Sequence, residues 1–109
     1  MMYKEKIEAY FADKQEQIIA DICRLIRVKS EREPAKPGMP FGEGPYNALM
    51  ESKKLAEEMG FATKNFDNYV VSAEMNDKEA YLGILAHVDV VSEGSGWTFP
   101  PYEGTVQDG

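Results

Sequence analysis

The chain has 109 residues, of which 43% are hydrophobic, and this composition fits one small globular domain rather than two domains or a disordered chain. Nineteen acidic residues against twelve basic ones give a net charge of −7, which argues against a nucleic-acid-binding surface. No apolar run is long enough to span a membrane, and the first residues do not resemble a signal peptide. With one cysteine, Cys23, predicted as a buried inert thiol, the sequence indicates a cytoplasmic protein.

Apolar residues at three- and four-residue steps predict a long helix over residues 3–28, interrupted near Lys14. A segment rich in proline and glycine follows over residues 30–45, and such a composition excludes both helix and central strand. The segment is longer than a usual connection, which favours a functional loop, and Phe41 in its middle is expected to anchor it.

A second helix is predicted to begin with Gly44 as its N-cap and Pro45 as its first residue, and to end before Gly60. Its apolar residues recur with helical spacing, so one face should pack on a core. Gly42 and Gly44 resemble part of a phosphate-binding loop, but no Gly-Lys-Ser/Thr follows, and nucleotide binding is therefore not expected.

Three strand candidates come next, over residues 61–65, 69–75 and 80–87, with turns at residues 67–68 and 76–77. The order of two helices and then strands predicts an α/β fold in which a mixed sheet is covered by helices.

The third strand candidate leads directly into the candidate site residues. The stretch Tyr81–Val91 reads Tyr-Leu-Gly-Ile-Leu-Ala-His-Val-Asp-Val-Val, and its apolar run predicts a strand buried on both faces. His87, the only histidine, and Asp89 are two residues apart, so an extended chain places them on one side. Imidazole is a common zinc ligand, and a carboxylate can orient it. Taken alone, this spacing favours a histidine that ends a strand beside a solvated or turn-forming aspartate.

The wider pattern resembles one family, the zinc peptidase superfamily of aminoacylases, acetylornithine deacetylases, carboxypeptidase-G-like enzymes and carnosinases, and within it bacterial PepV-like dipeptidases. The block Leu-Gly-Ile-Leu-Ala-His-Val-Asp-Val-Val followed by Gly-Trp-Thr-Phe-Pro-Pro-Tyr carries most of the resemblance. Further matching pieces lie in the same order along the chain, at residues 22–30, 41–45, 59–61, 67–69 and 108–109.

The resemblance implies metal-dependent hydrolysis of peptide or amide bonds in dipeptides or short peptides at a di-zinc centre. It makes His87 a metal ligand and Asp89 the active-site residue beside it. Two zinc ions per full-length subunit would polarise the scissile carbonyl and activate the attacking water, and cobalt or manganese would suit such ligands as well. The chain departs from the family at Lys29 and Ser92, where proline is usual. Both positions lie in loops, so the differences affect the expected local backbone conformation and not the expected chemistry.

The resemblance also implies that residues 1–109 are the incomplete N-terminal portion of a metallopeptidase catalytic domain, because the family's other ligands and its general base lie further along. A hairpin turn at residues 108–109 without a returning strand agrees with truncation. One histidine holds zinc poorly, so this piece alone is predicted to be inactive. Uncovered apolar edges would favour self-association.

Two alternatives stay open: a non-catalytic, truncated relative that serves as a folded or binding module, and a mononuclear amidase formed by association of chains. The aromatic residues Trp97, Phe99 and Tyr102 are predicted to hold a loop on the core rather than to line a substrate entrance. Glu93 and Glu103 are predicted to be solvated rather than metal ligands. The pattern does not define which substrate side chains are preferred.

Overall fold

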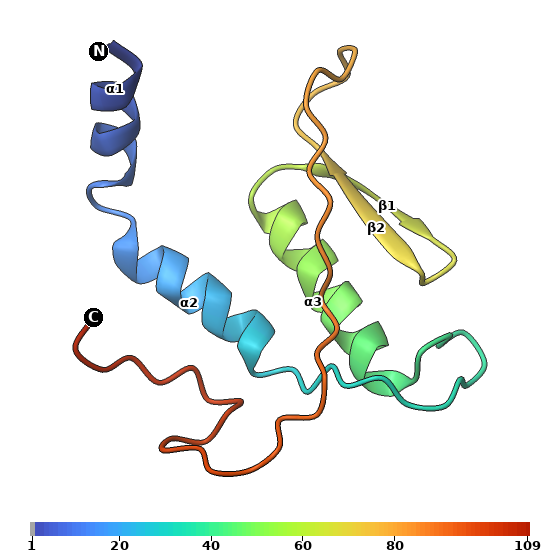
Figure 1. Ribbon diagram of the computed structural model, residues 1–109. Coiled ribbons are helices and arrows are strands. Elements are labelled where there is room, and N and C mark those ends of the chain that lie inside the picture. Colours follow the sequence, from blue (N-terminus) through green and yellow to red (C-terminus); the bar gives the residue numbers. More distant parts are fainter. Residues whose placement is uncertain (1) are drawn as a thin grey trace.

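The computed structural model describes residues 2–109, which form three helices and one β-hairpin (Figure 1). In chain order the elements are α1 (Met2–Phe11), α2 (Gln15–Ile26), α3 (Glu43–Glu58), β1 (Ala62–Phe66) and β2 (Val70–Glu74). The predicted mixture of helices followed by strands, an α/β fold, is confirmed.

The predicted interruption of the first helix is confirmed at Lys14, which is the N-cap of α2. The Lys14 ammonium donates a hydrogen bond to the carbonyl of Tyr10 (2.8 Å) and lies 4.0 Å from the centroid of the Tyr10 ring. It therefore binds one of the carbonyl groups that the end of α1 leaves without a helical partner. In Figure 1, α1 projects away from α3 and the hairpin, and none of its residues is buried.

Arg24 joins α2 to α3. Its Nε donates to the Glu51 carboxylate at 2.8 Å, and a second guanidinium nitrogen pairs with Glu58. Close to these ion pairs the apolar core is small, since Cys23 and Ala48 are the buried hydrophobic residues of the described chain. Charged pairs at the surface contribute little individually, so a core of this size leaves the packing of the two helices weak.

The start of α3 differs from the prediction. Its N-cap is Gly42, at φ 91°, and the helix begins at Glu43, so the expected cap at Gly44 is wrong. Gly44 is needed for another reason, because a Cβ there would lie 2.3 Å from the carbonyl oxygen of Lys29. At the other end, Gly60 follows the C-cap with φ 92°, as predicted for a helix terminator.

The hairpin forms as predicted, with β1 antiparallel to β2 and a turn at residues 67–68. Asp67 and Asn68 have φ of 53° and 63°, the positive values that the central residues of a type I′ turn require, and the N–H of Tyr69 donates to the Phe66 carbonyl at 3.0 Å. The Asn68 side chain also donates to the carbonyl of Gly38 at 2.7 Å, and the rings of Phe41 and Tyr69 meet edge to face at 5.5 Å. These contacts anchor the loop over residues 30–45 to the hairpin, as predicted for Phe41.

The third predicted strand is wrong. Residues 80–87 are extended but belong to no sheet within residues 2–109, and their apolar side chains are exposed instead of buried. The first paired position is Val90, whose N–H donates to the carbonyl of Ser30 at 3.3 Å in an isolated parallel bridge. A strand is stable only beside another strand, and the hairpin packs on α3 without pairing to this segment.

The molecule is open rather than compact. Its radius of gyration is 16.6 Å, against about 13 Å expected for a compact domain of this length. Its accessible surface of 9092 Å² compares with about 6,100 Å² for a folded monomer of this mass. Within residues 2–109, no helix has the length and apolar character that a membrane span needs.

Candidate functional site

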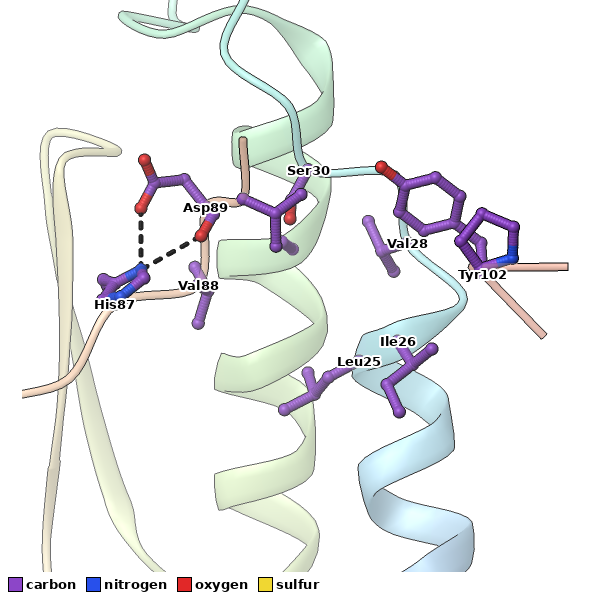
Figure 2. A pocket seen from close by; sticks show the side chains of 11 residues that line it. Leu25, Ile26, Val28, Ser30, His87, Val88, Asp89 and Tyr102 are labelled. Atoms are coloured by element: carbon purple, nitrogen blue, oxygen red, sulfur yellow. Dashed lines mark hydrogen bonds and ion pairs between the residues drawn. The ribbon is translucent and has the colours of Figure 1, made fainter. Parts of the chain in front are cut away.

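His87 and Asp89 lie side by side, as their spacing predicts. Nδ1 of His87 is 3.1 Å from Oδ1 of Asp89 and 3.0 Å from the Asp89 carbonyl oxygen (Figure 2). The tautomer with its proton on Nδ1 donates to these oxygens and leaves the lone pair of Nε2 free to accept a proton or bind a metal. Metal-binding histidines in proteins are oriented in this way by a carboxylate or a carbonyl.

The backbone around the pair is held by one bridge. The Val90–Ser30 hydrogen bond fixes the chain immediately after Asp89 against the beginning of the 30–45 loop. Ser30 is buried, and the neighbouring carbonyl of Lys29 lies against Gly44 in the first turn of α3. The pair is therefore placed by backbone contacts with α3 and the loop rather than by a sheet.

A cavity of about 350 Å³ adjoins the pair. His87 and Asp89 line it together with side chains that are mostly apolar, among them Leu25 and Ile26 from α2 (Figure 2). The side chains of His87 and Asp89 are 84% and 57% exposed, so a solute can reach both. The arrangement offers an accessible nitrogen base, a carboxylate and an adjoining apolar wall.

Tyr102 closes another part of the cavity and was not predicted there. Its hydroxyl donates to Oε2 of Glu93 at 3.4 Å, and Trp97 Nε1 donates to the Glu93 carbonyl at 2.7 Å. Lys29 Nζ lies 3.6 Å from Oε1 of Glu93. The prediction that aromatic residues hold this loop on the core is confirmed for Tyr102, which lines the cavity with residues of α2. It is wrong for Trp97 and Phe99, which are 58% and 41% exposed. Glu93 pairs with Lys29 rather than standing alone in solvent.

The loop has a pH-dependent contact. A hydrogen bond from its own backbone N–H, and then the charge of Lys29, lower the pKa of Glu93 below its ordinary 4.5. A lowered folded-state pKa means that the carboxylate stabilises the loop fully above pH 4.5 and that this contribution is lost as the pH falls through the folded value. We expect Trp97 fluorescence to change in that acidic range, and Glu93→Gln to remove the transition. An unchanged transition in this variant would assign it to another group.

Cys23 is buried, as predicted, and its thiol lies 3.4 Å from the carbonyl oxygen of Gly104. Gly104 has φ 71°, and a Cβ there would lie 2.5 Å from the Cys23 sulfur. This contact holds the chain after Tyr102 against α2. No periodic pattern in the sequence predicts a contact between residues so far apart. The hydrogen bond between Ser30 and Val90 is equally unpredictable from the sequence.

The side chains of His87 and Asp89 are of types that bind zinc, but there are only two of them at this site. Imidazole and carboxylate are both zinc ligands, and a catalytic zinc ion takes about three protein ligands. Residues 2–109 contain no group of three or more histidine, cysteine, aspartate or glutamate side chains that could hold a metal ion. The roles of His87 as ligand and Asp89 as its neighbour therefore stay predictions, as does weak metal binding by the isolated chain.

No protein-family model matches the chain. "Putative dipeptidase YtjP" of Bacillus subtilis is 38% identical over 98 residues, which are 88% of this chain and 21% of that protein. Proteins named "Putative dipeptidase" in Staphylococcus aureus strains USA300 and NCTC 8325 are 38% identical over 109 residues, 98% of this chain and 22% of theirs. The chain thus spans about a fifth of the length of the curated relatives it matches, and nearly all of it is similar to part of proteins that carry this name.

Proposed function

We propose that the protein containing these residues hydrolyses peptide bonds in dipeptides or short peptides by metal-dependent catalysis. The observation that supports this most strongly is the His87–Asp89 pair, an accessible imidazole with its Nδ1 held by a carboxylate at 3.1 Å. The adjoining cavity gives room for a small substrate, and the similarity to proteins named as dipeptidases favours a peptide.

In this proposal His87 holds the metal through Nε2, and Asp89 keeps the proton on Nδ1 and fixes the orientation of the ring. The metal, zinc in the first place and cobalt or manganese as alternatives, would supply Lewis-acid polarisation of the carbonyl and a nucleophilic water at neutral pH. A di-zinc centre needs more ligands than this pair, so the other ligands and the general base are proposed to come from further polypeptide. A cytoplasmic location belongs to the same proposal, because Cys23 is free.

A chimera tests the function. Residues 1–109 would replace the matched segment of the Bacillus subtilis relative, and hydrolysis of a panel of unmodified and N-acetylated dipeptides would be followed before and after chelation and after zinc is restored. We expect turnover of dipeptides that is lost on chelation and regained with zinc, and no turnover by the 109-residue chain alone.

The parent relative is the matched control for the chimera. If the parent hydrolyses dipeptides and the folded chimera does not, the peptidase proposal is contradicted for this chain, and the alternative of a non-catalytic folded or binding module takes its place. Turnover that survives complete removal of metal would contradict the metal-dependent part.

A further inference from the structure

Gly44 lies buried in the first turn of α3, where the helix itself gives no reason for a glycine. Alanine is the better helix former, and φ at Gly44 is not positive, so the backbone conformation does not require glycine either. The requirement is space, because a Cβ built on Gly44 lies 2.3 Å from the carbonyl oxygen of Lys29 and 3.3 Å from that of Glu31. The first turn of α3 therefore touches the backbone that precedes the 30–45 loop.

A single layer of backbone lies between α3 and the chain that carries the site. The oxygens of Lys29 and Glu31 lie against Gly44, and successive carbonyl groups of an extended chain point to opposite sides. The oxygen of Ser30 therefore points away from α3, and it accepts a hydrogen bond from the N–H of Val90 at 3.3 Å. A displacement on the α3 side reaches the site chain through this one hydrogen bond.

The hydrogen bond at Val90 also orients the carbonyl that holds the His87 ring. The N–H of Val90 and the carbonyl of Asp89 belong to one planar, trans peptide group, in which the two bonds point in opposite directions. While Ser30 holds the N–H, the carbonyl faces Nδ1 of His87, 3.0 Å away. No other backbone–backbone hydrogen bond reaches residues 80–99 in the part of the chain that the structure describes.

We propose that Gly44 is a positioning residue for the His87–Asp89 pair, acting through the layer of backbone between α3 and the site. A carbon atom needs about 3.3–3.6 Å from a carbonyl oxygen, so an alanine side chain would displace the chain at Lys29 by about 1 Å. The displacement would move the hydrogen-bond acceptors of Nδ1 and release the ring. The consequence for catalysis rests on the proposed function, whereas the consequence for the ring does not.

A purely structural role for Gly44 leads to a different expectation. Alanine would then lower the stability of α3 and leave the His87 ring unchanged in the folded chain. Gly60→Ala is the matched control, because it strains the other end of α3 without approaching the site. Gly60 has φ 92°, and no atom lies within 4 Å of a Cβ built there.

Nuclear magnetic resonance of the chain with isotope-labelled histidine tests the effect on the ring. His87 is the only histidine, so one pair of ring-nitrogen signals reports its tautomer. In mildly alkaline solution, where imidazole is neutral, we expect the proton on Nδ1 in the unmodified chain. Gly44→Ala should move the ring toward the Nε2–H form that imidazole prefers in water, and Gly60→Ala should not. Far-UV circular dichroism checks that both variants keep their helices.

Amide exchange at Val90 tests the intermediate contact. Its hydrogen bond should slow exchange by about 10-fold relative to an unstructured chain, and Gly44→Ala should remove this protection. Ser30→Ala keeps the accepting carbonyl and should retain it, because the backbone and not the hydroxyl makes the contact. If Gly44→Ala loses its helices, Val90→Pro is measured in its place. Proline removes the N–H donor without touching α3 and should change the tautomer in the same way.

The chimera with the Bacillus subtilis relative tests the consequence for catalysis. Gly44→Ala should lower kcat for dipeptides by about 10-fold, because a misplacement of about 1 Å is costly at a reacting centre. KM should change by less than about 2-fold, since the pair acts on the bound carbonyl rather than on substrate binding. Zinc should be lost at a lower chelator concentration than in Gly60→Ala. A chimera without any activity would contradict the proposed function alone, because the tautomer and the exchange of Val90 are measured without turnover.

Three results would overturn the proposal. An unmodified chain with the His87 ring mainly in the Nε2–H form, or with an unprotected Val90 amide, lacks the proposed arrangement. A folded Gly44→Ala variant with unchanged tautomer and exchange would leave Gly44 a purely structural residue. Equal changes in Gly44→Ala and Gly60→Ala would assign the effect to a general loss of stability in α3.

Discussion

Replacing His87 by alanine in the chimera with the Bacillus subtilis relative is expected to lower kcat/KM for dipeptides by more than about 100-fold. Loss of a residue that only supports a metal ligand costs about 10–100-fold, and loss of the ligand itself should cost more. The effect should be accompanied by a lower zinc content per chain, measured after dialysis. His87 is 84% exposed and its ring makes hydrogen bonds only to Asp89, so the substitution should leave the fold intact.

The matched control is Tyr81→Ala, which removes a fully exposed side chain from the same segment without touching the pair. It should retain the activity and zinc content of the unmodified chimera. If His87→Ala keeps both as well, the imidazole is not a ligand, and the histidine is only an exposed residue beside a solvated aspartate.

Replacing Asp89 by asparagine should lower activity by about 10–100-fold, less than the loss of His87. Asparagine keeps the size of the side chain and can still accept from Nδ1, but it lacks the negative charge that strengthens this hydrogen bond. The backbone carbonyl of residue 89, 3.0 Å from Nδ1, is still present in this variant, so part of the constraint on the orientation of the His87 ring survives. We expect metal to be retained at high zinc and to be lost at lower concentrations than in the unmodified chimera.

Asp89→Ala separates the two contributions, since it removes the side-chain acceptor together with the charge. If asparagine and alanine reduce activity equally, the charge matters and the hydrogen bond does not. If neither variant changes activity or zinc affinity, the proposed role of Asp89 is wrong.

Elements with local signals could be predicted from the sequence. The hairpin turn follows from Asp67 and Asn68, which tolerate positive φ, and the end of α3 follows from Gly60. The pairing of His87 with Asp89 follows from their two-residue spacing in an extended chain. Each of these depends on a few neighbouring residues and needs no knowledge of the rest of the fold.

Other features depend on contacts between distant residues, and there the sequence was insufficient. An apolar run predicts a buried strand only if another strand is present to pair with it, and residues 80–87 have none in the described chain. The place of Tyr102 beside the cavity depends on its bond to Glu93, and the start of α3 on the close approach of Gly44 to Lys29. Neither of these two contacts produces a periodic pattern in the sequence.

The first helix has a consequence for how the protein unfolds. α1 spans ten residues and buries none of them, and isolated helices shorter than about 12–15 residues are marginal in water. Fraying of α1 therefore exposes almost no new apolar surface and is nearly independent of the global transition. Amide protons in residues 2–11 should exchange with solvent far sooner than those of α3, as a separate and early-melting cooperative unit.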